Sequence, residues 1–335
     1  MFMKTLRFAA VVISALLFVG VAKCAQRNRP EFIVFTGLCD ASAATAIDQH
    51  HFLVASDEDS RIRIYREDTP GPPVQVFDLR DFLELDTQHP ETDIEAAARV
   101  DDIVYWITSH GRNAEGKRRV SRERFFATRI LRKGDTFDLV PEGRPCKSLL
   151  AAMKTHPHLR KFDLSEAATK APKDIGGLNI EGLAAMPDGR MLIGFRNPVP
   201  ESRALIVPLL NPKEVIAGAE PRLGDPILID LGGLGIRDMV WTDRGCFIIG
   251  GPTSGKPQGK VFLWDGVSTT SRQIARLRGH NFNPEAFVLF NSPDTPKALL
   301  LSDDGTRRID GCPCKELKDE GSRQFRAAWV DLDGE

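Results

Sequence analysis

The sequence repeats one pattern five times, and this repetition constrains the fold more than any other feature. Each copy has an acidic residue followed by small and apolar residues, then a turn, an apolar strand, a polar cluster and a second apolar strand. The acidic residues that open the copies are Asp40, Glu95, Glu181, Asp238 and Glu285. A further short apolar strand follows four of the copies, so that a complete unit has four strands. Four-stranded units repeated around an axis are the blades of a β-propeller, and we therefore predict an all-β chain of this architecture.

The number of blades depends on how two segments are interpreted. The fifth copy lacks its fourth strand, whereas an apolar strand, Phe32-Ile33-Val34-Phe35, precedes the first copy. We expect this N-terminal strand to complete the last blade, because the edges of a sheet must be protected from pairing with other chains. The segment 145–171 spaces its Leu and Met residues as a helix does and has few β-branched or aromatic residues. We predict a helical insertion there and five blades in all, with six as the alternative if this segment conceals another blade.

The N-terminus has the features of a secretory signal peptide. Lys4 and Arg7 precede an apolar run over residues 8–21, and the small residues Gly20 and Ala22 follow at its end. We predict cleavage after residue 22, a single propeller domain over 31–335, and export to the periplasm or the medium. The apolar run is shorter than the about 20 residues that a transmembrane helix needs, so no transmembrane segment is expected. Cys24 leaves lipid attachment open, although Lys23 stands where lipid-attachment signals have a small residue.

Charge and motifs exclude several classes of partner. The 45 Lys and Arg residues nearly cancel the 46 Asp and Glu residues, and this balance excludes the basic field on which nucleic-acid binding depends. No phosphate-binding glycine loop is present, since the glycines at 232–235 follow a strand but open no helix, and we expect no nucleotide cofactor. The chain is expected to be a monomer that acts on or binds a small anionic molecule or an ester.

The positions of the cysteines predict a disulfide between the first and last copies of the repeat. Cys39 opens the first copy, while Cys312 and Cys314 lie in the long loop of the last copy, which becomes its neighbour once the ring closes. We predict a disulfide from Cys39 to one of these two, and favour Cys314. The spacing of Cys312 and Cys314 is one residue, whereas zinc ribbons use two, so a zinc site is not expected. Cys246, within an apolar run, is interpreted as a buried free thiol.

The repeated polar positions are expected to converge. In a propeller the first strand of each blade lines the central channel, and it starts on the face where the loop between the second and third strands emerges. The five acids are therefore predicted to ring one mouth of the channel and to hold Ca²⁺ or another divalent ion, which takes oxygen ligands. The candidate catalytic residues are His110, Arg112, Glu181 and Arg196, and the candidate ligand-binding residues are Asn113, Asn197, Arg237, Asp303 and Asp304. In the simpler alternative each acid only hydrogen-bonds the backbone of a neighbouring blade.

Several of these motifs resemble those of a known family. They are the segments 39–43, 56–59, 109–113, 179–183, 194–198 and 235–238, and they are similar to the hallmarks of the domain-of-unknown-function 3616 family. This resemblance covers nearly the whole mature chain and implies a propeller, but it supplies no established activity. The Ile180-Glu181-Gly182-Leu183 element with its Pro187-Asp188-Gly189 turn also resembles phytase-esterase-like propellers and, more distantly, calcium-dependent lactonase propellers.

Two functions fit this sequence. The first is a metal-assisted hydrolase of an ester or phosphoester, in which carboxylates hold the ion, His110 is the base, and Arg112 and Arg196 bind an anionic substrate. The second is a non-catalytic propeller whose polar mouth binds a small molecule or a partner protein.

Overall fold

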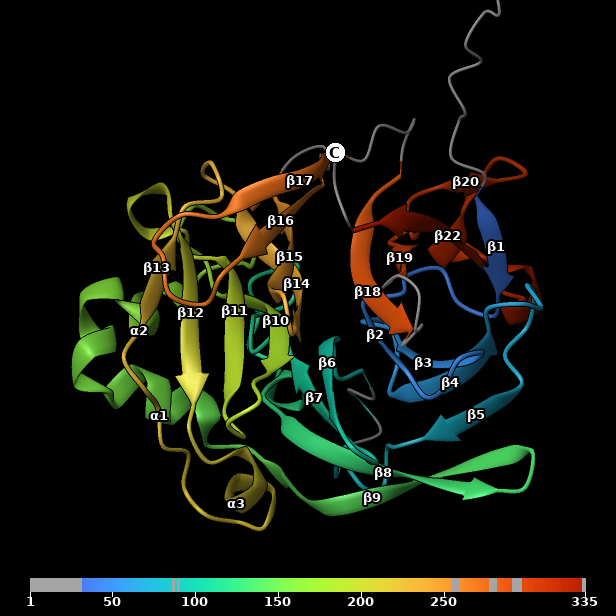
Figure 1. Ribbon diagram of the computed structural model, residues 1–335, viewed down its shortest axis with the longest axis horizontal. Coiled ribbons are helices and arrows are strands. Elements are labelled where there is room, and N and C mark those ends of the chain that lie inside the picture. Colours follow the sequence, from blue (N-terminus) through green and yellow to red (C-terminus); the bar gives the residue numbers. More distant parts are fainter. Residues whose placement is uncertain are drawn as a thin grey trace, which may run out of the picture.

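Five four-stranded antiparallel sheets surround a common axis in the computed structural model, which describes residues 32–85, 88, 91–254, 259–276, 282–290 and 297–332. Figure 1 shows the sheets as the blades of a propeller, with the first strand of each blade closest to the axis. Consecutive first strands contact one another all the way around the ring. The predicted five-bladed β-propeller is therefore confirmed.

The first four blades follow the chain in order. Blade one contains β2 (Ala43–Ala46), β3 (His51–Ala55), β4 (Arg61–Arg66) and β5 (Gln75–Asp78). Blade two contains β6 (Ile94–Val100), β7 (Ile103–Thr108), β8 (Phe125–Lys133) and β9 (Thr136–Cys146). Blade three contains β10 (Asn179–Ala185), β11 (Met191–Asn197), β12 (Ala204–Leu209) and β13 (Ile227–Ile229). Blade four contains β14 (Gly235–Thr242), β15 (Gly245–Gly251), β16 (Lys260–Trp264) and β17 (Arg272–Arg276).

The fifth blade joins the two ends of the domain. Its strands are β18 (Pro284–Phe290), β19 (Lys297–Ser302), β22 (Gln324–Asp331) and, as the outer strand, β1 (Ile33–Thr36). β1 pairs antiparallel with β22, with Phe35 opposite Phe325, as the closure argument predicted. The loop between β19 and β22 carries the small hairpin of β20 (Arg308–Ile309) and β21 (Cys312–Pro313). A disulfide then links Cys39 to Cys314, with 5.8 Å between their Cα atoms.

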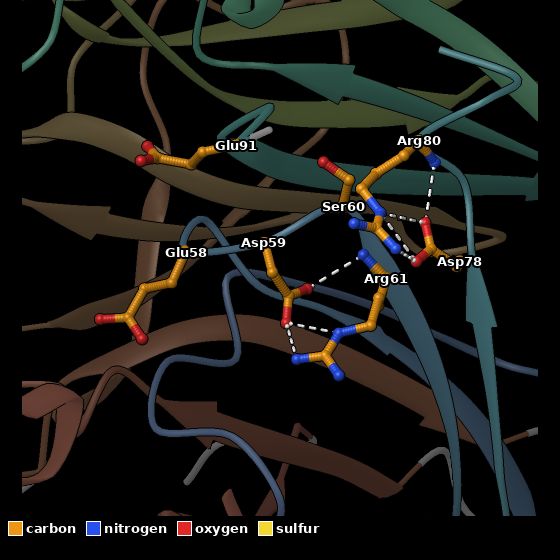
Figure 2. Close-up of a pocket in the computed structure, with 7 residues that line it drawn as sticks. All are labelled: Glu58, Asp59, Ser60, Arg61, Asp78, Arg80 and Glu91. Atoms are coloured by element: carbon orange, nitrogen blue, oxygen red, sulfur yellow. Dashed lines mark hydrogen bonds and ion pairs between the residues drawn. The ribbon is translucent and has the colours of Figure 1, made fainter. Parts of the chain in front are cut away.

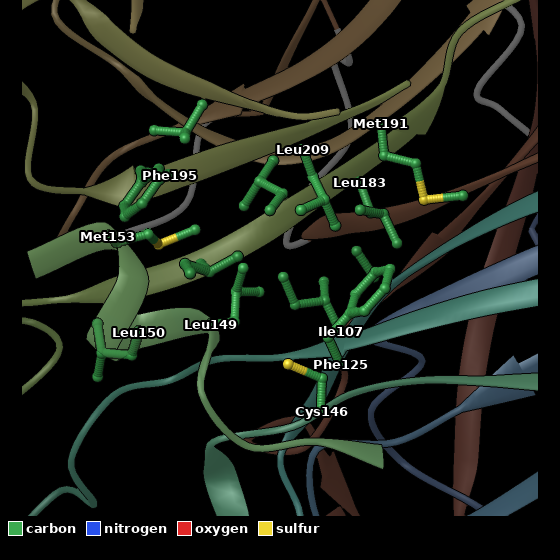
Figure 3. Close-up of a cluster of buried hydrophobic side chains, with 14 of the residues drawn as sticks. Ile107, Phe125, Cys146, Leu149, Leu150, Met153, Leu183, Met191, Phe195 and Leu209 are labelled. Atoms are coloured by element: carbon green, nitrogen blue, oxygen red, sulfur yellow. The ribbon is translucent and has the colours of Figure 1, made fainter. Parts of the chain in front are cut away.

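The segment after β9 is helical. It contains α1 (Leu149–Thr155), a 3₁₀ turn over Pro157–Phe162 and α2 (Leu164–Ala167), and it covers the outside of blade three. In Figure 3 the side chains of Leu149 and Met153 lie among those of Phe195 and Leu209, and all four are buried. Burying a Leu or Met side chain contributes about 1.5–3 kcal/mol, so this packing fixes the insertion against the blade.

Shorter helices lie in the loops between strands: α3 (Pro212–Ile216) and 3₁₀ turns at Val120–Arg122, Pro200–Ser202, Cys314–Glu316 and Glu320–Ser322. No helix within the described part of the chain is long and apolar enough to cross a membrane. The predicted signal peptide lies outside the described residues.

Apolar side chains fill the spaces between neighbouring blades. Phe52 and Tyr65 of blade one pack on Phe35 and Phe325 of blade five, with ring centroids 5.2 to 5.8 Å apart. These rings bury the seam at which the propeller closes. Strands packed in this way on both faces form a rigid frame for the side chains of the channel.

Candidate functional site

Four of the five first strands contain a β-bulge near their start. The pairing of these strands with their neighbours is interrupted between Ile94 and Ala96, Ile180 and Gly182, Ile236 and Asp238, and Pro284 and Ala286. The residues at the interruptions are Glu95, Glu181, Arg237 and Glu285. A bulge redirects its side chain out of the regular alternation, and here it turns each of these side chains toward the others in the channel.

Three of the four bulge residues form a compact group, which we call the glutamate triad: Glu95, Glu181 and Glu285. Each offers a carboxylate oxygen within 4.8 Å of the oxygens of the other two, and all three residues are buried. They come from blades two, three and five, and are therefore far apart in the sequence. Oxygen ligands so close together on a rigid frame can coordinate a hard divalent ion.

Two guanidinium groups partly neutralise the triad. Arg196 Nη1 donates to Glu181 Oε1 at 2.7 Å, and Arg237 pairs with the carboxylate of Glu285. Arg237 Nε also lies 3.7 Å from Glu181 Oε2, an oxygen that accepts no hydrogen bond. Burial raises the pKa of Glu285 to about 7 against the opposing effect of Arg237. Burial and the neighbouring Glu181 raise the pKa of Glu95 well above its usual range.

A second set of acids, the aspartate group, lies beside the triad: Asp40, Asp57 and Asp303. Asp40 and Asp303 face each other across an isolated antiparallel bridge between blades one and five. Asp303 accepts hydrogen bonds from Gly305 N at 2.9 Å and from Asn283 Nδ2 at 3.0 Å. Asp40 Oδ1 and Asp57 Oδ1 are buried and accept none. The pKa of Asp40 is raised first by burial and then by Asp303, and that of Asp57 by burial and then by Asp93.

Asp93, Asn179 and Asn283 were not among the predicted site residues, although each lies two residues before a glutamate of the triad. Asp93 pairs with Arg122 at 2.9 Å, and burial raises its pKa to about 6. Asn179 Nδ2 donates to Glu181 Oε1 at 2.6 Å. The recurrence of Asp or Asn two positions before the acid was the signal that could have found them.

Asp238, expected as a metal ligand, is separate from the triad. Its Oδ2 accepts the backbone N–H of Phe287 in the next blade at 2.7 Å, and its Oδ1 accepts that of Met239 at 2.8 Å. The bulge in β14 falls at Arg237, so the register directs Asp238 toward the neighbouring strand. Asp238 thus has the backbone-bonding arrangement of the simpler alternative.

Four polar residues, three in a loop of blade two and Asn197 at the end of β11, form local hydrogen bonds. The ring of His110 is buried, its Nδ1 donates to Thr108 O at 2.8 Å, and burial lowers its pKa to about 4. Arg112 donates to the carbonyl oxygens of Ala168 and Gly116. Asn113 Oδ1 accepts from Lys117 N, and Asn197 Nδ2 donates to the carbonyl oxygens of Pro172 and Asp174.

The carboxylate of Asp304 is also bound outside the triad, by Arg326. Its two oxygens accept from the guanidinium of Arg326 at 2.6 and 2.8 Å. This bidentate pair lies within blade five and its loop. Asp303 and Asp304, although adjacent, therefore have different environments.

A polar pocket of about 270 Å³ opens beside the loop that supplies Asp57. Figure 2 shows Arg61 bonded to Asp59, Arg80 bonded to Asp78, and Glu58 and Glu91 on the other side. Glu91 pairs with Arg122, which also holds Asp93. The pocket is thus connected to the acids of the channel through one shared arginine.

A second cavity, of about 1100 Å³, is lined by the first strands beyond their bulges. Its lining includes Ala44, Ala97, Leu183, Asp238 and Phe287, one from each blade. In blades two to five these residues follow the bulge position by one or two residues. The two ends of the first strands therefore differ, with the glutamate triad at the starts and a cavity lined by both polar and apolar residues farther along.

Comparison with known proteins gives a family and a set of structures. The family model described as "Protein of unknown function (DUF3616)" matches residues 40–133 and 132–287. No curated protein matches the chain. Glutaminyl cyclase from Myxococcus xanthus is similar with a TM-score of 0.45 and 9% identity, over 91% of this chain and 97% of that chain. The PQQ-bound aldose sugar dehydrogenase from Streptomyces coelicolor gives a TM-score of 0.42 and 11% identity, over 90% of this chain and 100% of that chain.

Proposed function

The chain belongs to the DUF3616 family, and from its channel site we propose that it binds a divalent cation such as Ca²⁺ and uses it to hydrolyse an ester or phosphoester. The observation that carries this proposal is the glutamate triad, with three buried carboxylates within 4.8 Å. Buried charges of one sign are costly unless they are paired or coordinate a metal. The two nearby arginines offset only part of this cost.

The donor set supports a hard cation. All the candidate ligands are carboxylate oxygens, and Glu181 Oε2 is a buried oxygen that accepts no hydrogen bond. Ca²⁺ takes 6–8 oxygen ligands and accepts water among them, so three glutamates from three blades are a sufficient protein contribution. A bound cation would polarise the carbonyl or phosphoryl oxygen of a substrate.

We do not assign the proton-transfer role to His110. His110 is hydrogen-bonded to Thr108, and its charged neighbours are Glu123 and Arg124, which lie outside the acid groups. Glu95 is kept as a cation ligand, because no guanidinium lies within ion-pair distance of it in the described part of the chain. A bound cation would lower the pKa of a coordinated water, which would then serve as the nucleophile. Arg196 holds Glu181 in place and keeps a positive charge beside an anionic substrate.

Calcium titration calorimetry and a panel of esters, lactones and phosphoesters assayed with and without Ca²⁺ test the proposal. We expect Glu95→Gln and Glu181→Gln to lose cation binding and turnover. The matched control is Glu142→Gln on β9, whose carboxylate pairs with Arg129 at 2.8 Å on the outside of blade two. Cation binding without turnover of any of these substrates would reject the hydrolase and favour the non-catalytic propeller. Absence of cation binding would reject both the cation site and the hydrolase.

We also propose that the protein is exported. The disulfide between Cys39 and Cys314 supports this, because disulfides persist in oxidising compartments. N-terminal sequencing of the mature protein from a cell fractionation is expected to begin at Lys23. Recovery of the intact N-terminus in the cytoplasmic fraction would contradict this prediction.

A further inference from the structure

Asn179, two residues before Glu181, has a buried oxygen without a hydrogen-bond partner. Its Nδ2 donates to Glu181 Oε1 at 2.6 Å, and this bond sets the orientation of the amide. The amide oxygen, Oδ1, is buried and accepts no hydrogen bond within the described residues. Asn179 as a residue is only 5% exposed, so bulk solvent does not supply the missing partner.

Glu181 Oε2 is a second buried oxygen of this kind, and Glu181 is 2% exposed. Because Asn179 and Glu181 are hydrogen-bonded to each other, the two oxygens belong to one small region of the channel. Buried polar atoms are nearly always hydrogen-bonded, and each exception requires an explanation. A ligand that accepts electron pairs from oxygen would supply a partner for both atoms.

The equivalent residues of the other two triad blades have partners within the protein. In blade five, Asn283 Oδ1 accepts from Arg237 Nη1 at 3.2 Å, and Asn283 Nδ2 donates to Asp303 at 3.0 Å. In blade two, Asp93 pairs with Arg122 at 2.9 Å. Both oxygen-bearing groups are therefore bound by an arginine. Blade three differs, because no arginine of the described chain contacts the oxygen at this position.

The charge around Asn179 favours a cation over a neutral hydrogen-bond donor. The three carboxylates of the triad face two guanidiniums, those of Arg196 and Arg237. Buried charges of one sign are stabilised by pairing or by a coordinated metal. A metal ion would satisfy both unpartnered oxygens and offset the remaining charge, whereas a buried water would satisfy the oxygens alone.

From these contacts we propose that Asn179 Oδ1 is a fourth protein ligand of the cation at the glutamate triad, and that the site therefore selects Ca²⁺ over Mg²⁺. This inference rests on the proposed function, because it concerns the same ion. Ca²⁺ takes 6–8 oxygen ligands in flexible geometry and accepts Asn carbonyl oxygens among them. Mg²⁺ demands a near-ideal octahedron and usually keeps several waters, and four side chains held on three blades disfavour this arrangement.

Terbium luminescence of the full chain tests the proposal, with Tb³⁺ as a probe that occupies oxygen-ligand Ca²⁺ sites. Luminescence lifetimes in H₂O and D₂O count the waters bound to the ion. We expect Asn179→Ala to bind Tb³⁺ with one more water than the wild type and with an affinity lower by about 10–100-fold. Asn179→Ser, whose side chain is one atom shorter than that of Asn, gives the same expectation if Asn179→Ala does not fold.

The matched control is Asn283→Ala, at the equivalent position of blade five, because the oxygen of Asn283 is bound by Arg237. This control is expected to keep the wild-type number of waters. Competition by Ca²⁺ and by Mg²⁺ for the bound Tb³⁺ measures the selectivity. We expect Ca²⁺ to displace Tb³⁺ at the lower concentration in the wild type, and the difference between the two ions to shrink in Asn179→Ala.

The outcomes separate this inference from the proposed function. Tb³⁺ binding that is lost in Glu95→Gln, with unchanged water count and affinity in Asn179→Ala, overturns the role of Asn179 and leaves the proposed function intact. An equal gain of water in Asn283→Ala also overturns it, because the effect would then be a general loosening of the channel. Equal competition by Mg²⁺ and Ca²⁺ overturns the selectivity. Absence of Tb³⁺ and Ca²⁺ binding in the wild type overturns both the proposed function and this inference.

Discussion

Arg237 occupies in blade four the bulge position that Glu285 occupies in blade five, and the two side chains form an ion pair inside the channel. An arginine thus replaces the acid at one position of an otherwise acidic set. Both residues are buried, and Arg237 also lies near Glu181. The pair therefore joins blade four to the triad.

Replacing Arg237 by Met is expected to lower the free energy of unfolding by about 1–3 kcal/mol, because Glu285, whose pKa is about 7 even beside Arg237, takes up a proton and is left as a buried carboxyl without its partner. The double variant Arg237→Met with Glu285→Gln is expected to recover part of this loss. Urea unfolding at pH 7 measures both. A loss of less than about 1 kcal/mol in the single variant would contradict the buried ion pair, because ordinary substitutions already cost about 0.5–3 kcal/mol.

Stability is expected to fall as the pH rises in the absence of divalent cations. Burial raises the pKa of Asp93 to about 6 and that of Glu285 to about 7, above the about 4 of unfolded acids. Between about pH 4 and pH 7 the folded state holds more protons on these two groups than the unfolded state, so their contribution to stability is fully present below about pH 4 and is lost as the pH rises through 6 and 7. Thermal melting in a chelator from pH 5 to 8 measures the decline. Excess Ca²⁺ is expected to reverse the decline at pH 8, and an unchanged melting temperature would contradict the proposed cation site at the glutamate triad.

Removal of the disulfide by Cys39→Ser with Cys314→Ser is expected to cost about 2–5 kcal/mol, because the bridge closes a loop of 275 residues and joins the first blade to the last. The control is Cys312→Ser, which changes the free cysteine in the same loop. We expect this control to remain within about 0.5 kcal/mol of the wild type in urea unfolding. Equal losses in the two variants would mean that the loop, and not the bridge, is responsible.

The Asp238→Asn variant tests whether Asp238 has a structural role, in contrast to the candidate cation ligands. Because the Asp238 carboxylate accepts two backbone N–H groups, the variant is expected to lose about 1–3 kcal/mol of stability while keeping its Ca²⁺ stoichiometry. Glu181→Gln is expected to behave in the opposite way, with a loss of cation binding and little change in unfolding. Calorimetric titration and urea unfolding of the same two preparations distinguish the roles. Loss of an ion in Asp238→Asn would return this residue to the metal site.

The repeat in the sequence was sufficient to predict the propeller, the closure by Phe32 to Phe35 and the helical insertion. Each of these depends on a local pattern of apolar residues or on the number of strands, which can be counted along the chain. The pairing of Cys39 with Cys314 followed from the same count, since ring closure brings the first and last blades together. The sequence also marked Glu95, Glu181 and Glu285 as equivalent, because they recur at one place in three copies.

Only the tertiary structure decided which polar residues share a site. A bulge shifts the register by one residue, so it exchanged the roles of Arg237 and Asp238, and no local pattern marks where a bulge falls. The loop residues His110, Arg112 and Asn197 form hydrogen bonds with nearby loops and the insertion, which depend on loop conformation and not on position in the repeat. The strand pattern thus determined the frame, because apolar periodicity is a local property, whereas the direction of each polar side chain was set by contacts between distant segments.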